Sequence, residues 1–165
     1  MTELDFTHVR QIQAAEGWLG LGDHASAGQE LDALPSEIQR HPLVLRLRWE
    51  VFSAAKKWDS ALEAATLFTQ VDPDDKHAWL SRSFALHELK RTAEARENLL
   101  AVIDKFPGYA LLRYNLACYE CQLGNLEVAC ARLRETFALP GGKEFRSTGM
   151  LDPDLAPLRA EIPRL

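Results

Sequence analysis

The chain has 165 residues, of which 47% are hydrophobic and 26% are charged, and its net charge is −5 at pH 7. This composition is typical of one globular domain or a short array of repeats and excludes a disordered chain. The acidic balance argues against nucleic-acid binding, and no apolar run reaches the roughly 18 to 20 residues that span a membrane. The start of the chain lacks an export signal and only three cysteines occur, so we expect a cytoplasmic protein with free thiols.

The expected elements, in chain order, are helices joined by short turns. The first covers residues 2–20, with Thr2 as its N-cap, and its buried side is expected to consist of Leu4, Val9, Ile12 and Ala15. Three later helices with apolar residues at three-and-four spacing are predicted at 41–55, 77–89 and 109–123. Each precedes a second amphipathic helix, at 60–71, 93–106 and 126–139, and proline or glycine ends each second helix.

A repeat of 34 residues connects these elements. Alanine recurs at Ala27, Ala61, Ala95 and Ala129. The positions five residues before each alanine are Gly22, Lys56, Lys90 and Gly124, and the positions four residues after it are all apolar. Two antiparallel helices that cross closely need a small side chain at their contact. We therefore expect each of these alanines to be buried where the two helices of one repeat meet.

These residues resemble the tetratricopeptide-repeat family, most clearly at Trp79, Ala95 and Pro107. The resemblance implies an all-α fold, a right-handed superhelical solenoid of about four 34-residue helix-turn-helix repeats with a C-terminal capping helix. It implies one domain over residues 1–165, and the repeats would cover 8–41, 42–75, 76–109 and 110–143, with the cap at 144–165. Trp49 departs from the family pattern, which usually has a small residue there, so the second repeat is expected to be splayed or repacked.

The C-terminal segment is predicted to cover the exposed end of the last repeat. We expect a short helix near 143–148, broken by Gly149. After it, Asp152 and Pro153 have the N-cap and first-turn pattern of a new helix, whose apolar stripe would consist of Leu155, Leu158 and Ile162. An alternative is that this segment docks a partner.

The cysteines lie within 13 residues of one another, at Cys118, Cys121 and Cys130. A redox CxxC motif needs its first cysteine at a helix N-terminus, whereas Cys118 and Cys121 are expected in the middle of a helix. A zinc site needs four ligands, and beyond these two cysteines the register offers His87 but no fourth. The pattern favours packing or groove lining, so we expect no metal and no cofactor.

No catalytic, phosphate-binding or dinucleotide-binding motif occurs in the chain, so we expect that it is not an enzyme. The resemblance implies a concave groove, lined by the first helices, that binds an extended or helical segment of a partner protein. The groove residues would include Arg46, Glu50, His77, Leu80, Phe84, His87, Tyr114, Cys118, Cys121 and Gln122. Phe84 and Tyr114 are the expected anchors.

Binding of a chaperone C-terminal carboxylate, known in one branch of the family, is not expected, because Glu16 and Glu50 would repel it. Two alternatives to partner binding stay open. One is self-assembly through the terminal repeats, which would give a homo-oligomer. The other is a small metal or redox protein that uses the cysteines.

Overall fold

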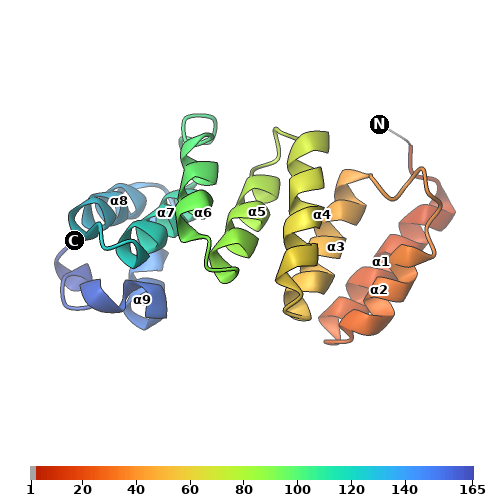
Figure 1. The fold of residues 1–165 in the computed structure, drawn as a ribbon, viewed down its shortest axis with the longest axis horizontal. Coiled ribbons are helices and arrows are strands. Elements are labelled where there is room, and N and C mark those ends of the chain that lie inside the picture. The colour runs from red at the N-terminus through yellow and green to blue at the C-terminus, as the bar shows by residue number, and fades with distance from the viewer. Residues whose placement is uncertain (1–2) are drawn as a thin grey trace. The chain divides into compact units, whose positions relative to one another are not determined.

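The computed structural model describes residues 3–165, in which helices and turns occur and no strand is found (Figure 1). The helices are α1 (Phe6–Gly20), α2 (His24–Asp32), α3 (Pro42–Ala54), α4 (Trp58–Val71), α5 (Lys76–Glu88), α6 (Thr92–Leu100), α7 (Ala110–Gln122), α8 (Leu126–Ala138) and α9 (Phe145–Leu151). Three short 3-10 helices lie near the C-terminus: η1 (Gly142–Glu144), η2 (Pro153–Leu158) and η3 (Ile162–Arg164). No helix in this range is both long enough and apolar enough to cross a membrane.

The chain divides into two compact units, a first unit at Met1–Leu89 and a second unit at Lys90–Leu165. In the first unit, α1 packs on α2 and α3 on α4, and α5 packs on α4. In the second unit, α7 packs on α8, and α6 packs on α7. The division falls in the turn of the predicted third repeat, between its two helices.

The recurring alanines are buried, as predicted from the 34-residue spacing. Ala27, Ala61, Ala95 and Ala129 each have no exposed surface. The residues four positions later are equally buried, namely Leu31, Ala65, Leu99 and Leu133. A larger side chain at any of these alanines would separate the two packed helices, so the spacing marks the tightest contacts of the fold.

The turns between paired helices share one backbone conformation. Gly22, Lys56, Lys90 and Gly124 all have positive φ, at 79°, 54°, 64° and 82°. A left-handed residue ends a helix and reverses the chain, and glycine adopts this conformation at the least cost. The two lysines adopt it because the packed helices on either side fix the turn, and not because of their own preference.

The first helix is shorter than predicted, and Thr2, its expected N-cap, lies outside the described residues. The helix begins at Phe6, because the Asp5 carboxylate accepts a hydrogen bond from the His8 amide nitrogen at 2.8 Å and so satisfies a free backbone donor of the first turn. Ile12 and Ala15 are buried as predicted, and Leu4 packs partly against the same cluster. The prediction for Val9 was wrong, since its side chain is exposed.

The helix predicted at 93–106 also ends early, at Leu100. Beyond it the amide nitrogens of Val102, Ile103 and Lys105 donate to carbonyls three residues back, at 3.0 to 3.5 Å. These are turn-type bonds, tighter than those of an α-helix. The adjacent β-branched residues Val102 and Ile103 lower the helix propensity at this point.

The C-terminal segment packs on α7, as expected of a cap, but its helices differ from the prediction. Helix α9 continues through Gly149, so the expected break is wrong. Gly149 is buried there, and a Cβ atom would approach the side chains of Leu155 and Ile162 at 3.3 and 3.4 Å. The capping element after Asp152 is the 3-10 helix η2, within which Pro157 lacks the N–H group that an α-helix needs. Its apolar residues Leu155 and Leu158 are buried as predicted.

Candidate functional site

The predicted groove residues lie on first helices of both units. We call six of them the α3/α5 surface: Arg46 and Glu50 on α3, and His77, Leu80, Phe84 and His87 on α5. We call the other four the α7 surface: Tyr114, Cys118, Cys121 and Gln122. The first set belongs to the first unit and the second set to the second unit.

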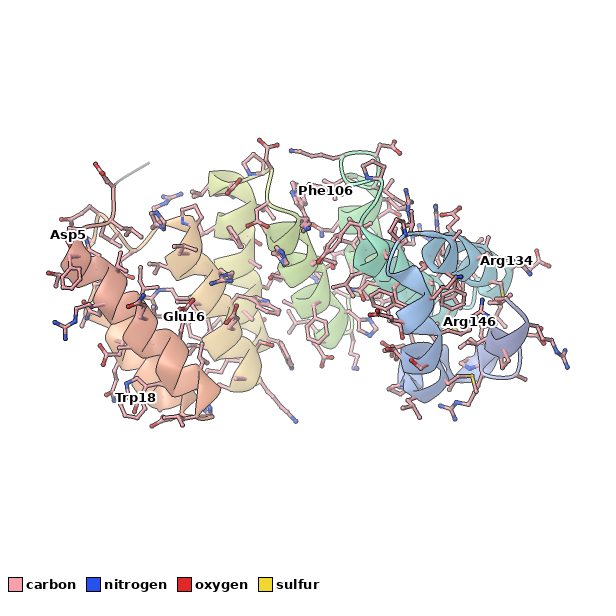
Figure 2. The ribbon with its side chains drawn as sticks, turned by 180° about the vertical axis from the view of Figure 1, so that it is seen from behind. Asp5, Glu16, Trp18, Phe106, Arg134 and Arg146 are labelled. Carbon is pink, nitrogen blue, oxygen red and sulfur yellow. The ribbon has the colours of Figure 1, made fainter. Side chains whose placement is uncertain are left out.

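At the α3/α5 surface, Arg46 interacts with carboxylates of two helices. Its Nη2 atom donates to Oε1 of Glu16 on α1 at 3.0 Å, and its Nε atom lies 3.9 Å from Oε1 of Glu50. Figure 2 shows Glu16 on the side of α1 that faces α3. Burial raises the pKa of Glu50, and the positive charge of Arg46 offsets part of this effect. One guanidinium thus serves two partly exposed carboxylates.

Phe84 contacts two tryptophans of the neighbouring helices. Its ring centroid lies 6.2 Å from that of Trp49 on α3 and 5.8 Å from that of Trp58 on α4, and both pairs are edge to face. This geometry is the favoured one for aromatic pairs. Trp49, the residue that departs from the family pattern, is therefore accommodated by packing against Phe84. Phe84 itself remains 38% exposed.

Two buried nitrogen atoms at this surface have no hydrogen-bond acceptor among the described residues. They are Nε1 of Trp49 and Nε of Arg46, one helical turn apart on α3. A buried N–H group without an acceptor costs about 1 to 3 kcal/mol. The sequence gave no sign of this, because acceptor placement depends on neighbouring helices. The surface is thus less completely satisfied than an ordinary packed core.

The other predicted residues on α5 differ in exposure. Leu80 and His87 are buried, so they fill space between helices. His77 is exposed, and its amide nitrogen donates to the Asp75 carboxylate at 2.7 Å, which caps α5. The open part of the α3/α5 surface therefore consists of Arg46, Glu50, His77 and Phe84.

The α7 surface is covered by the chain's own C-terminal segment. The Tyr114 hydroxyl donates to Oδ2 of Asp152 at 2.7 Å, and the Cys118 thiol lies 3.6 Å from the same oxygen. The Gln122 side chain donates to the Asp154 carbonyl at 2.9 Å. The Tyr114 ring also lies against Phe145, with 4.9 Å between the ring centroids. Three of the four predicted residues at this surface thus make contacts within the chain.

The cysteines have none of the features that activate a thiol. Cys118 and Cys121 are buried, and burial is the main cause that raises the pKa of each; the nearby acidic side chains of Asp152 and Asp154 act in the same direction. Cys118 lies within α7 as predicted, whereas Cys121 lies in its last turn rather than in the middle. Reactive cysteines need a lowered pKa. Among residues 3–165, no three or more His, Cys, Asp or Glu side chains are grouped to hold a metal ion.

Comparison with known proteins identifies the fold. No protein-family model and no curated protein sequence matches the chain. Among solved structures, the crystal structure of MamA matches 99% of this chain and 91% of its own, with a TM-score of 0.72 and 17% identity. The MamA RS-1 ArsTM double mutant matches 77% of this chain and 71% of its own, with a TM-score of 0.70 and 16% identity.

A further MamA mutant matches 79% of this chain and 76% of its own, with a TM-score of 0.65 and 15% identity. At these identities the likeness concerns the fold alone. MamA is a helical-repeat protein similar to the tetratricopeptide repeats, and the present chain has the same all-α repeat fold, as predicted.

Proposed function

We propose that the chain is a non-catalytic interaction module that binds a partner protein or peptide through the open part of its first-helix surfaces. The observation that carries this proposal is the α3/α5 surface, where a partly exposed Phe84 lies beside the charged side chains of Glu16, Arg46 and Glu50. Aromatic and arginine side chains supply most of the binding energy at protein interfaces. Repeat folds present such surfaces because each repeat buries its core against its neighbours.

The proposal differs from the expectation at one point. Tyr114 was expected to be the second anchor, but its hydroxyl and ring are engaged by Asp152 and Phe145. Partner binding is therefore assigned to the first unit. The proposal includes a cytoplasmic location, for which the three free cysteines are the support.

The test is affinity capture from a lysate of the source cells, with the wild-type chain and the Phe84→Ala variant as baits. We expect Phe84→Ala to lose specific partners, because it removes the exposed ring of the surface. Phe6→Ala is the matched control, since Phe6 is also an exposed phenylalanine but lies on α1. Circular dichroism checks that both variants fold. If Phe84→Ala retains every partner, the assignment of this surface is wrong.

A second candidate function is self-assembly, and one observation favours it. Phe6 and Leu21, at the two ends of α1, are 77% and 79% exposed. Large apolar side chains that are exposed to this degree can mark a contact with another protein. A second copy of the chain would cover them in an oligomer, and the oligomeric state in solution tests this function.

A further inference from the structure

The charges of the α3/α5 surface leave one carboxylate incompletely compensated. Arg46 lies closer to Glu16 than to Glu50, at 3.0 Å against 3.9 Å. Within the described part of the chain, no hydrogen bond reaches the Glu50 carboxylate. The Glu50 side chain is 39% exposed, so a group from another molecule can reach it. A positively charged donor would make a charge-assisted hydrogen bond there.

The aromatic part of the surface lies at the same level. Glu50 and Phe84 are 34 residues apart, so they occupy the same position of successive repeats. Their helices, α3 and α5, contact each other, and the axes of packed helices lie about 8 to 10 Å apart. A side chain placed between the two helices at this level would therefore meet the carboxylate on one side and the ring on the other.

A lysine or arginine side chain suits this combination of groups. Its charged end can pair with a carboxylate while its apolar stem lies along an aromatic ring. The charged end also gains from a nearby ring face. The edge-to-face contacts of Trp49 and Trp58 hold the Phe84 ring in place, so little order has to be gained on binding.

We propose that the α3/α5 surface binds a partner segment in which a lysine or arginine stands next to an apolar residue, with the cationic group at Glu50 and the apolar group on Phe84. This inference rests on the proposed function, because it names the chemistry of the segment bound by the same surface. Glu16 and Glu50 outnumber Arg46, so an acidic segment would be repelled.

The experiment measures the binding of short peptides to the full chain by fluorescence anisotropy. The probes are dye-labelled acetyl-Gly-Leu-Lys-Leu-Gly-amide and two versions in which norleucine or glutamate replaces the lysine. Norleucine keeps the apolar stem and removes the charge. We expect the lysine peptide to bind about five-fold more tightly than the norleucine peptide, with the glutamate peptide weaker than both. Added salt should reduce the difference.

Variants of the chain locate the effect. Glu50→Gln should remove most of the preference for lysine, while Phe84→Ala should weaken the binding of the lysine and norleucine peptides alike. Glu63→Gln is the matched control, because it removes the same net charge at an exposed position of α4 and should retain the preference. The inference is overturned if the lysine peptide does not bind, if lysine and norleucine peptides bind equally, or if Glu63→Gln acts like Glu50→Gln.

The failure of this inference can be told apart from the failure of the proposed function. If Phe84→Ala loses partners from the lysate while the peptides show no preference for lysine, the surface binds proteins through other chemistry. If Phe84→Ala loses no partner, the proposed function itself fails, whatever the peptides do.

Discussion

Glu50 illustrates how a single side chain can serve binding at the expense of folding. Its carboxylate is half-buried, and its attraction to Arg46 offsets only part of the cost of burial. Residues whose ionisation is disfavoured by their surroundings are concentrated at functional sites. Evolution towards stability alone would place a neutral residue at this position, so its charge points to a use outside the fold.

The first prediction concerns Glu50→Gln and the pH dependence of stability. The pKa of Glu50 in the folded state is raised above its ordinary value of 4.5, so the folded chain holds this proton to a higher pH than the unfolded chain does. Stability from this group is present below pH 4.5 and is lost as the pH rises through the folded-state pKa. Glu50→Gln should therefore raise the free energy of unfolding at pH 7, by less than about 0.5 kcal/mol because solvent screens the charge.

Urea unfolding at pH 4 and pH 7 measures this effect, and the gain should disappear at the lower pH. Glu63→Gln, at an exposed position, serves as the control and should change little at either pH. A loss of stability in Glu50→Gln at pH 7 would mean that the attraction between Glu50 and Arg46 outweighs the cost of burial.

Among the elements, the turns after α3 and after α7 offer a direct comparison. Lys56 and Gly124 occupy the same position, and both have positive φ. A Cβ atom at Gly124 would meet no atom within 4 Å. A substitution there therefore changes the backbone energy of the turn without any steric clash.

We predict opposite effects at these two positions. Gly124→Ala should lower the free energy of unfolding by about 1 kcal/mol, because an L-residue is strained in the left-handed conformation. Lys56→Gly should raise it by about 0.5 kcal/mol, since relief of the same strain exceeds the entropy that glycine adds to the unfolded chain. Guanidinium unfolding of both variants is the measurement. A destabilised Lys56→Gly would indicate that the lysine side chain contributes to packing or to charge.

The elements that repeat could be predicted from the sequence, and those that do not repeat could not. The 34-residue spacing identified Ala27 and its equivalents, because each one occupies the same tight contact. The end of α6 at Leu100 and the continuous path of α9 through Gly149 have no counterpart in other repeats. Their positions depend on local hydrogen bonds and on contacts such as that between Gly149 and Leu155.

The candidate site was predictable to a similar extent. The register placed Arg46, Glu50 and Phe84 on first helices, and the structure agrees. The contact of Tyr114 with Asp152 joins residues 38 positions apart outside the repeat pattern. No periodic signal therefore indicated that the α7 surface would be covered.

At the scale of the whole molecule, self-association is the open alternative to partner binding. The last prediction is that, if the chain assembles through α1, Phe6→Ser combined with Leu21→Ser will dissociate the oligomer, since both side chains are among the most exposed apolar groups. Multi-angle light scattering over a range of concentrations measures the mass. A monomer in the wild-type chain at every concentration would exclude assembly.

The cover on α7 also bears on how the chain is made. The segment that holds Tyr114 through Asp152 is synthesised only after α7 has been completed. A ribosome adds about 5 to 20 residues per second, so for some seconds the nascent chain carries an apolar helix without its lid. During that interval the face is accessible to chaperones, and mistakes in assembly at this end of the protein would begin there.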